Sequence, residues 1–311
     1  MTSAISGIFN ILATPFNPDD SLDLPGLRRL VDFQLDLGAH GLTILGVLGE
    51  AAKLSVEERR EVMETVMDTV NGRVPVVVGA SHQDDATRLA LCRAAEDAGA
   101  AGVMVAPPGM EAPTDEAVFA IYSDLAHGCD MAIVVQDFPP VNDIFMSAPL
   151  IASIAREIPA ARYLKLEDPP LMQKISEIRA EVDGLEIFGG LGGMFLLEEL
   201  GRGASGTMTG FAFTEILIAV FDAWCGGQEE RAQCIFDQYL PLIRFENQPV
   251  INLSIRKELL RRRGAFDCNR PRPPFAAIDD GTLQEIDWVF ERVGIGDPTR
   301  KIEFHTTGVP A

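Results

Sequence analysis

The sequence predicts an α/β protein, a (β/α)₈ barrel with a helical C-terminal extension. Eight short runs rich in Val, Ile, Leu and Met recur along the chain, and a segment with helical periodicity follows each one. The runs contain almost no alternating polar residues, which is typical of parallel strands covered on both faces. Eight alternations of this kind favour the closed barrel. The expected strands are 8–14, 41–47, 74–79, 102–106, 131–136, 162–167, 185–189 and 204–209.

Helix signals occupy the intervals between these runs. Ser55 precedes "VEERREVMETVMDTV", and Glu58 lies three residues later, which is the pattern of a capping box. Pro149 begins the helical pattern "LIASIAREI", a favoured place for proline. Three further helical patterns follow the eighth run: 212–225, 229–244 with 249–263, and 279–294.

These patterns also predict how the chain is divided. We expect the barrel in residues 1–215 and the extension in residues 216–311, packed on the barrel as one structural unit. The main alternative is a doubly wound open sheet. A dinucleotide-binding sheet of that type carries GxGxxG after its first strand, and this motif is absent after 8–14.

Composition restricts the classes of partner. A formal net charge of −20 at pH 7 repels nucleic acid and anionic membrane surfaces. The sequence has no long uninterrupted apolar run and no basic, apolar leader pattern. Five scattered cysteines without a CxxC spacing indicate reduced thiols, so we expect a cytoplasmic protein. The four histidines form no ligand-like pair, and no metal site is predicted; they are His40, His82, His127 and His305.

Lys165, in "RYLKLEDPP" (162–170), is the most informative candidate for chemistry. It is the only one of five lysines inside a strand-like run, near the end that faces the active site in a barrel. An inward-facing amine is desolvated, which can lower a lysine pKa by up to ~3–5 units and make the amine a nucleophile toward ketones. The alternative is a lysine that reaches solvent or pairs with Glu167.

A second candidate is the turn in "LGVLGEAAKLS" (45–55). Gly46 and Gly49 flank it directly after the second run, so its amides can approach a ligand closely. Such amides suit a carboxylate. The alternative is an ordinary connection that needs glycine for its backbone.

Taken together, an ordered set of motifs resembles one family. The set comprises "ATPF", "GVLGE", "VPVVVGA", "GVMVAPP", "QDFPP", "YLKLED" and "NQPVINLSIRKELL". Over about residues 5–295 the chain resembles the dihydrodipicolinate synthase/N-acetylneuraminate lyase family of class I aldolases. The resemblance implies a homo-oligomer, a dimer or a tetramer built from dimers, that needs no metal and no organic cofactor.

The resemblance also implies roles for individual residues. Lys165 would form a Schiff base with a 2-keto acid, and the "GVLGE" turn would hold the carboxylate of that small-molecule substrate. The substrate-binding residues expected are Val47, Leu48, Gly49, Glu50 and Met208.

Four positions depart from the family pattern. Val47 and Leu48 replace two threonines of the turn, and Gln136 replaces the tyrosine that moves protons at the end of the fifth strand. Val141 stands in place of an arginine that grips a second substrate, and Gly109 in place of a further tyrosine. These changes argue against dihydrodipicolinate synthesis itself and favour a bulkier or more apolar substrate.

The missing tyrosine leaves the proton carrier open. Tyr163 lies two residues before Lys165 and therefore on the same face of the strand. One hypothesis is that its phenol partly replaces the missing one, and the alternative is an aromatic ring that fills an inner barrel layer. Glu167 and His82 are further candidates, for which ion-pair or loop roles are the alternatives.

Two other functional classes stay open. "FGGLGGMF" (188–195) follows the seventh run, where some barrels bind phosphate, and it would suit a sugar-phosphate isomerase or epimerase. A barrel that has lost catalysis and only binds a keto acid would also explain the lost tyrosine. The basic stretch "IRKELLRRRG" (255–264) is interpreted as the end of a helix, not a nucleic-acid site.

The sequence therefore predicts a Schiff-base-forming lyase that cleaves or dehydrates a hydroxylated 2-keto acid. The catalytic residues expected are Lys165, Gln136 and Tyr163. The second choice is dihydrodipicolinate synthesis from pyruvate and aspartate semialdehyde.

Overall fold

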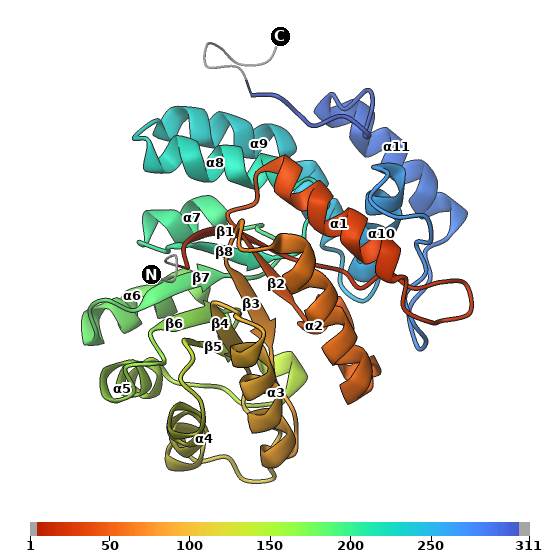
Figure 1. The fold of residues 1–311 in the computed structure, drawn as a ribbon. Helices are drawn as coiled ribbons and strands as arrows, with labels where there is room; N and C mark the ends of the chain where they lie inside the picture. Colours follow the sequence, from red (N-terminus) through yellow and green to blue (C-terminus); the bar gives the residue numbers. More distant parts are fainter. Residues whose placement is uncertain (1–4, 305–311) are drawn as a thin grey trace.

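A computed structural model describes residues 5–304, and its centre is a closed barrel of eight parallel strands (Figure 1). Each strand pairs with the next, and β8 pairs with β1 to close the sheet. The strands are β1 (Gly7–Ile11), β2 (Gly41–Ile44), β3 (Val76–Gly79), β4 (Gly102–Val105), β5 (Ile133–Asp137), β6 (Tyr163–Leu166), β7 (Glu186–Gly189) and β8 (Gly206–Thr209).

Helices connect the strands and surround the barrel. The surrounding helices are α1 (Leu24–Leu37), α2 (Val56–Val70), α3 (Asp85–Asp97), α4 (Asp115–Gly128), α5 (Ala148–Glu157), α6 (Leu171–Glu181), α7 (Leu196–Gly201) and α8 (Thr214–Cys225). Three short 3₁₀ turns lie in the connections: η1 (Val47–Gly49), η2 (Ala51–Lys53) and η3 (Pro139–Val141). The capping box at the start of α2 is confirmed: Ser55 Oγ accepts from the Glu58 amide, and the Glu58 carboxylate accepts from the Ser55 amide.

The predicted barrel is confirmed, and the open-sheet alternative is wrong because β8 and β1 are hydrogen-bonded neighbours. Every observed strand lies within its predicted run or extends one residue beyond it, at Gly7 and at Asp137. Continuous apolar runs located the strands because both faces of each strand are covered, one by the barrel interior and one by helices.

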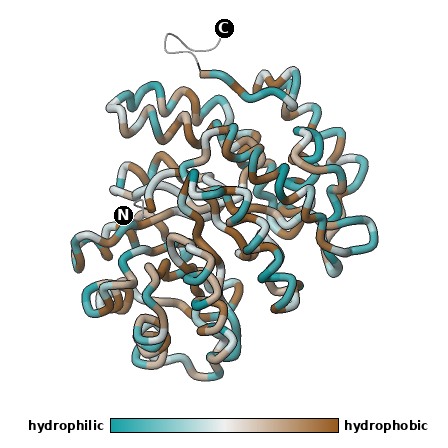
Figure 2. The backbone as a smooth tube through the Cα atoms, viewed as in Figure 1, coloured by the Kyte–Doolittle hydropathy of each residue, from teal (hydrophilic) through white to brown (hydrophobic). Residues whose placement is uncertain are grey.

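The barrel interior is filled by side chains and is not a pore. Its apolar layer contains Ile5, Phe9, Val77, Met104, Val134, Tyr163, Phe188 and Met208. Phe9 and Phe188 meet edge to face with ring centroids 5.9 Å apart. A second and larger apolar cluster lies between the outer face of the barrel and the helices. Figure 2 shows hydrophobic residues concentrated along the central strands and alternating with polar residues along the outer helices.

The C-terminal extension consists of α9 (Glu229–Glu246), α10 (Asn252–Arg262) and α11 (Asp280–Val293). Helix α9 lies along α8, and α10 and α11 lie on the α1 side of the barrel (Figure 1). Arg263, at the end of α10, forms a buried ion pair with Glu215 of α8, with 2.6 Å between Nη2 and Oε1. The extension is therefore joined to the barrel by buried polar contacts as well as apolar ones. The predicted division at residues 215 and 216 stays a prediction.

Two general features of the described chain bear on function. Within residues 5–304, no helix combines the length and the apolar character needed to cross a lipid bilayer. All five cysteines are free.

Glu199 is a buried acid outside the barrel. It lies on α7 against Gly189 of β7, where a Cβ atom would overlap its carboxylate. Burial, with smaller contributions from Glu198 and Glu167, raises the pKa of Glu199 to about 8. The folded protein therefore holds a proton here at neutral pH that an exposed glutamate would release.

Glu199 should make the folded state less stable as pH rises. Between its ordinary pKa of 4.5 and about 8, only the folded state keeps this proton, so its stabilising contribution is lost across that window. Glu199→Gln stays neutral throughout, so the variant should lose less free energy of unfolding than wild type between pH 5 and pH 8. Urea denaturation at several pH values measures this. Glu64→Gln, at an exposed glutamate of α2, is the control; equal pH dependence in Glu199→Gln and wild type would contradict the assignment.

Candidate active site

Lys165 lies inside the barrel near the carboxyl end of β6. In the sheet register it is paired with Gln136 of β5 on one side and with Phe188 of β7 on the other. Phe188 belongs to the inner layer, as does Tyr163 two residues before Lys165. The lysine is 3% exposed, so its amine occupies a desolvated position at the mouth of the barrel. The other four lysines lie in α6, α10, a 3₁₀ turn and the segment after α11.

Glu167 joins Lys165 and Gln136 in one buried polar cluster. Its Oε2 atom lies 3.0 Å from Lys165 Nζ and accepts a hydrogen bond of 2.9 Å from Gln136 Nε2. The side chains of Lys165 and Glu167 are 4% and 7% exposed, respectively. The pairing with Glu167 that the sequence left as an alternative is therefore present, and it places a carboxylate beside the amine.

A second polar cluster lies on the outer face of the same two strands. Lys174 of α6 contacts the carboxylates of Asp137 and Asp168, the latter at 2.7 Å. Burial raises the pKa of Asp137 to about 6, and the nearby Lys174 opposes that rise. The Glu167 amide also donates to the Asp137 carbonyl at 2.9 Å. The ends of β5 and β6 are thus held together on both faces.

The turn after β2 is held by hydrogen bonds at its end and leaves two of its backbone amides free. The amides of Gly49 and Glu50 donate within the turn, to Gly46 and Val47 respectively. Thr14 donates to the Gly49 carbonyl at 2.7 Å, which ties the turn to the segment after β1. Within residues 5–304 the amides of Val47 and Leu48 have no hydrogen-bond acceptor. These two donors are available to a ligand.

Met208 and Tyr163 lie in the inner apolar layer. Met208 is fully buried beside Phe9 in the register of β1 and β8. Tyr163 faces the same side of β6 as Lys165, as expected, but one pleat farther from the carboxyl end. Its ring packs near Phe188, with centroids 6.5 Å apart. These surroundings fit the filler interpretation of Tyr163 and place Met208 within the packed layer.

The remaining sequence candidates lie in the connecting loops. Val141 in η3 is 47% exposed, and the Gly109 carbonyl accepts from Gln83. His82 accepts from the Asp84 amide through Nδ1 and has no contact with Lys165 or Glu167. Residues 5–304 contain no group of three or more His, Cys, Asp and Glu side chains suited to a metal ion, and His305 lies outside the described residues.

In "FGGLGGMF", Gly192 and Gly193 have φ of 66° and 76°, which favour glycine, whereas Gly189 and Gly190 allow close packing. A Cβ atom on Gly190 would overlap the Glu167 side chain, just as one on Gly189 would overlap Glu199. The sequence analysis did not predict the close packing at Gly189 and Gly190, and it did not predict the Asp137–Lys174–Asp168 cluster. One signal was present: acids at 137, 167 and 168 end two adjacent strands, and in parallel strands these ends meet at one edge.

Comparison with known proteins agrees with this geometry. Residues 4–292 match the Dihydrodipicolinate synthetase family. The chain is 35% identical to an L-2-keto-3-deoxyarabonate dehydratase of Azospirillum brasilense, covering 90% of this chain and 92% of the relative. It is 28% identical to a 4-hydroxy-tetrahydrodipicolinate synthase of Methanopyrus kandleri, covering 94% and 97%.

Solved structures show the same architecture. A dihydrodipicolinate synthase from Rhodopseudomonas palustris superposes with a TM-score of 0.88 at 36% identity, covering 94% of this chain and 99% of that one. A putative dihydrodipicolinate synthetase from Pseudomonas aeruginosa gives a TM-score of 0.86 at 28% identity, covering 93% and all of that chain. The family matches nearly the whole described chain, and its members include both lyases and dehydratases. The protein therefore belongs to the dihydrodipicolinate synthetase family and is an enzyme of its lyase class.

Proposed function

We propose that this protein dehydrates a 2-keto-3-deoxy sugar acid through a Schiff base on Lys165. The observation that carries the proposal is the buried Lys165–Glu167 pair inside the barrel. The relative of Azospirillum brasilense, whose name is that of a keto-deoxy acid dehydratase, supports the choice of dehydration over condensation.

The pair provides a route to a neutral amine. Transfer of one proton from the Lys165 ammonium to the Glu167 carboxylate leaves an uncharged nitrogen, and the proton has only the 3.0 Å contact to cross. The amine attacks carbon 2 of the keto acid, and the oxygen of the resulting carbinolamine leaves as water after it takes the proton held by Glu167, which restores the carboxylate. The product of this step is an iminium ion that withdraws electrons from carbon 3.

The same carboxylate suits both proton transfers of the dehydration. Glu167 takes a proton from carbon 3, which gives an enamine, and then returns it to the hydroxyl on carbon 4 as that group leaves as water. The proton count closes without another donor, and hydrolysis of the imine frees Lys165. Gln136 cannot exchange a proton in this way. Its role is to hold Glu167 Oε2 through the 2.9 Å hydrogen bond.

The substrate's carboxylate would be held by the free amides of Val47 and Leu48. Gly49 and Glu50 complete that turn, and the apolar Met208 layer closes the barrel beneath the amine. Val141 and Gly109 provide no cation and no phenol for a second substrate, which supports a single hydroxylated substrate over aspartate semialdehyde.

The assembly and its location belong to the same proposal. We infer a cytoplasmic homo-oligomer, either a dimer or a tetramer, that uses no metal or organic cofactor. Family membership and the net charge of −20 support a small-molecule partner over nucleic acid.

Lys165 should form a covalent adduct with pyruvate. Incubation with pyruvate and borohydride reduces the Schiff base to a stable amine that intact mass spectrometry detects. We expect one adduct on wild type, none on Lys165→Ala, and an unchanged adduct on Lys301→Ala, which removes an exposed lysine. Wild type that gives no adduct with any of several 2-keto acids would favour a non-catalytic binding barrel, or an isomerase stabilised by phosphate.

The proton carrier can be identified by comparing two variants. Glu167→Gln keeps the shape of the side chain but cannot accept a proton, so trapping and turnover should slow by roughly 10²–10⁴-fold. Tyr163→Phe removes only the phenol oxygen. A trapping rate equal to wild type would remove Tyr163 from the mechanism, whereas a loss as large as that of Glu167→Gln would make the phenol the carrier.

The reaction type can be tested with a substrate screen. We expect release of water from 2-keto-3-deoxy sugar acids, measured by loss of the starting acid without formation of a free aldehyde fragment and pyruvate. Pyruvate plus aspartate semialdehyde should give no turnover above the rate of Lys165→Ala. Efficient condensation of that pair would instead establish synthase activity.

A further inference from the structure

Glu50 lies at the end of the turn, and its buried carboxylate forms several polar contacts. It follows Gly49 directly and has φ of 57°, in the left-handed region that non-glycine residues seldom occupy. Its side chain is 1% exposed. A charged group buried in an unfavourable backbone conformation persists only where its surroundings hold it there.

Three donors hold the Glu50 carboxylate, and two of them come from the C-terminal extension. Lys257 Nζ lies 2.6 Å from Oε1. On Oε2, Lys53 Nζ lies at 3.0 Å and the backbone amide of Arg272 donates at 2.9 Å. Lys53 Nζ also donates to the Arg272 carbonyl at 2.6 Å. The Glu50–Lys257 contact joins residues that are 207 positions apart in the sequence, and the Glu50–Arg272 contact joins residues that are 222 positions apart.

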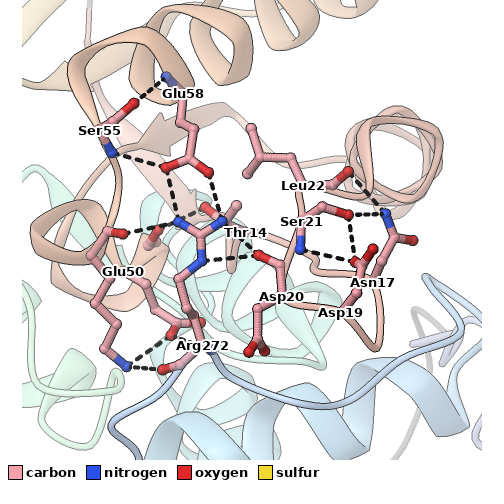
Figure 3. A network of polar contacts seen from close by, with 12 residues as sticks. Thr14, Asn17, Asp19, Asp20, Ser21, Leu22, Glu50, Ser55, Glu58 and Arg272 are labelled. Atoms are coloured by element: carbon pink, nitrogen blue, oxygen red, sulfur yellow. Dashed lines mark hydrogen bonds and ion pairs between the residues drawn. The ribbon is translucent and has the colours of Figure 1, made fainter.

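The Arg272 side chain extends the network on the other side of the turn. Its guanidinium donates to both oxygens of Glu58, at 2.6 and 2.9 Å, and to the carbonyls of Asp20 and Lys53. Figure 3 shows Arg272 between Glu50, Glu58 and Asp20. It therefore links the start of α2, the end of η2 and the segment before α1 to one loop of the extension.

The network holds the turn in place, and its charged side chains also act on the electrostatics of the turn. Two lysines face the one carboxylate of Glu50, so basic side chains outnumber acidic ones at the residue that follows the turn with the free Val47 and Leu48 amides. Burial lowers the pKa of Lys257 to about 8, and the nearby Glu50 opposes that decrease, so the ammonium is present at neutral pH. The Lys257 ammonium also lies 4.5 Å from the centre of the Phe16 ring.

We propose that Lys257 and Arg272 are positioning residues for the carboxylate of the 2-keto acid and act on it through Glu50. Thr14 fixes the end of the turn at the Gly49 carbonyl, and the extension fixes the next residue, Glu50. The free amides of Val47 and Leu48 directly precede these two anchors and are thereby held ready for an anion before it arrives. This inference rests on the proposed function, because it assumes that the turn binds the carboxylate.

The test uses pyruvate itself and measures the pyruvate concentration that gives half-maximal borohydride trapping. Lys257→Met should raise that concentration at least tenfold, while trapping at saturating pyruvate stays near wild type. Arg272→Gln keeps the backbone amide but loses the guanidinium contacts, so a rise of a few fold is expected. It also tests the inference if Lys257→Met does not fold.

Arg263→Met is the matched control, because it breaks an equally buried ion pair at the end of the same helix, with Glu215. It should lower thermal stability as Lys257→Met does, yet leave the half-maximal concentration unchanged. An equal shift in Lys257→Met and Arg263→Met, or no shift in either Lys257→Met or Arg272→Gln, would overturn the inference. Absence of any wild-type adduct would instead overturn the proposed function.

Discussion

The contact between Lys165 and Glu167 is the constraint on which the site depends. It requires two residues one pleat apart to point into the barrel, and it requires β5 to present Gln136 at the same level. Both conditions follow from strands of period two in a parallel register. An amine and a carboxylate enclosed together compensate each other's charge, whereas either one enclosed alone would resist burial.

Because successive side chains of a strand point to opposite faces, the residues next to Gln136 and Glu167 have a separate structural role. Asp137 and Asp168 follow Gln136 and Glu167 in the sequence, so they face the helices and meet Lys174. One pair of strand ends thus carries the proposed reactive cluster inside and a supporting cluster outside. The supporting cluster limits how far the inner carboxylate can shift, which matters because proton transfer depends steeply on distance.

Local patterns were enough to predict the barrel, the inward lysine and the turn after β2. The strands could be located because apolar runs report burial on both faces, and Lys165 could be selected because charge is rare in such runs. The spacing of Tyr163 from Lys165 predicted which face of the strand it occupies. It did not predict that the Phe188 ring packs near it. Contacts such as Glu50–Lys257 join segments that are distant in the sequence, and periodic sequence patterns do not predict them. Glu167 appeared only as an alternative, because its distance from Gln136 depends on strand register.

The Glu50 contacts join segments that are far apart in the sequence, and this separation has a consequence for folding during translation. The turn is synthesised 207 and 222 residues before its anchors at 257 and 272, and all eight strands are complete by Thr209, so the anchors follow the barrel in order of synthesis. A nascent barrel can therefore close around an active-site loop that is still unsupported. Under the proposed support of the turn, tight binding of the substrate carboxylate is acquired only when this later segment docks, so a chain without it would bind keto acids more weakly.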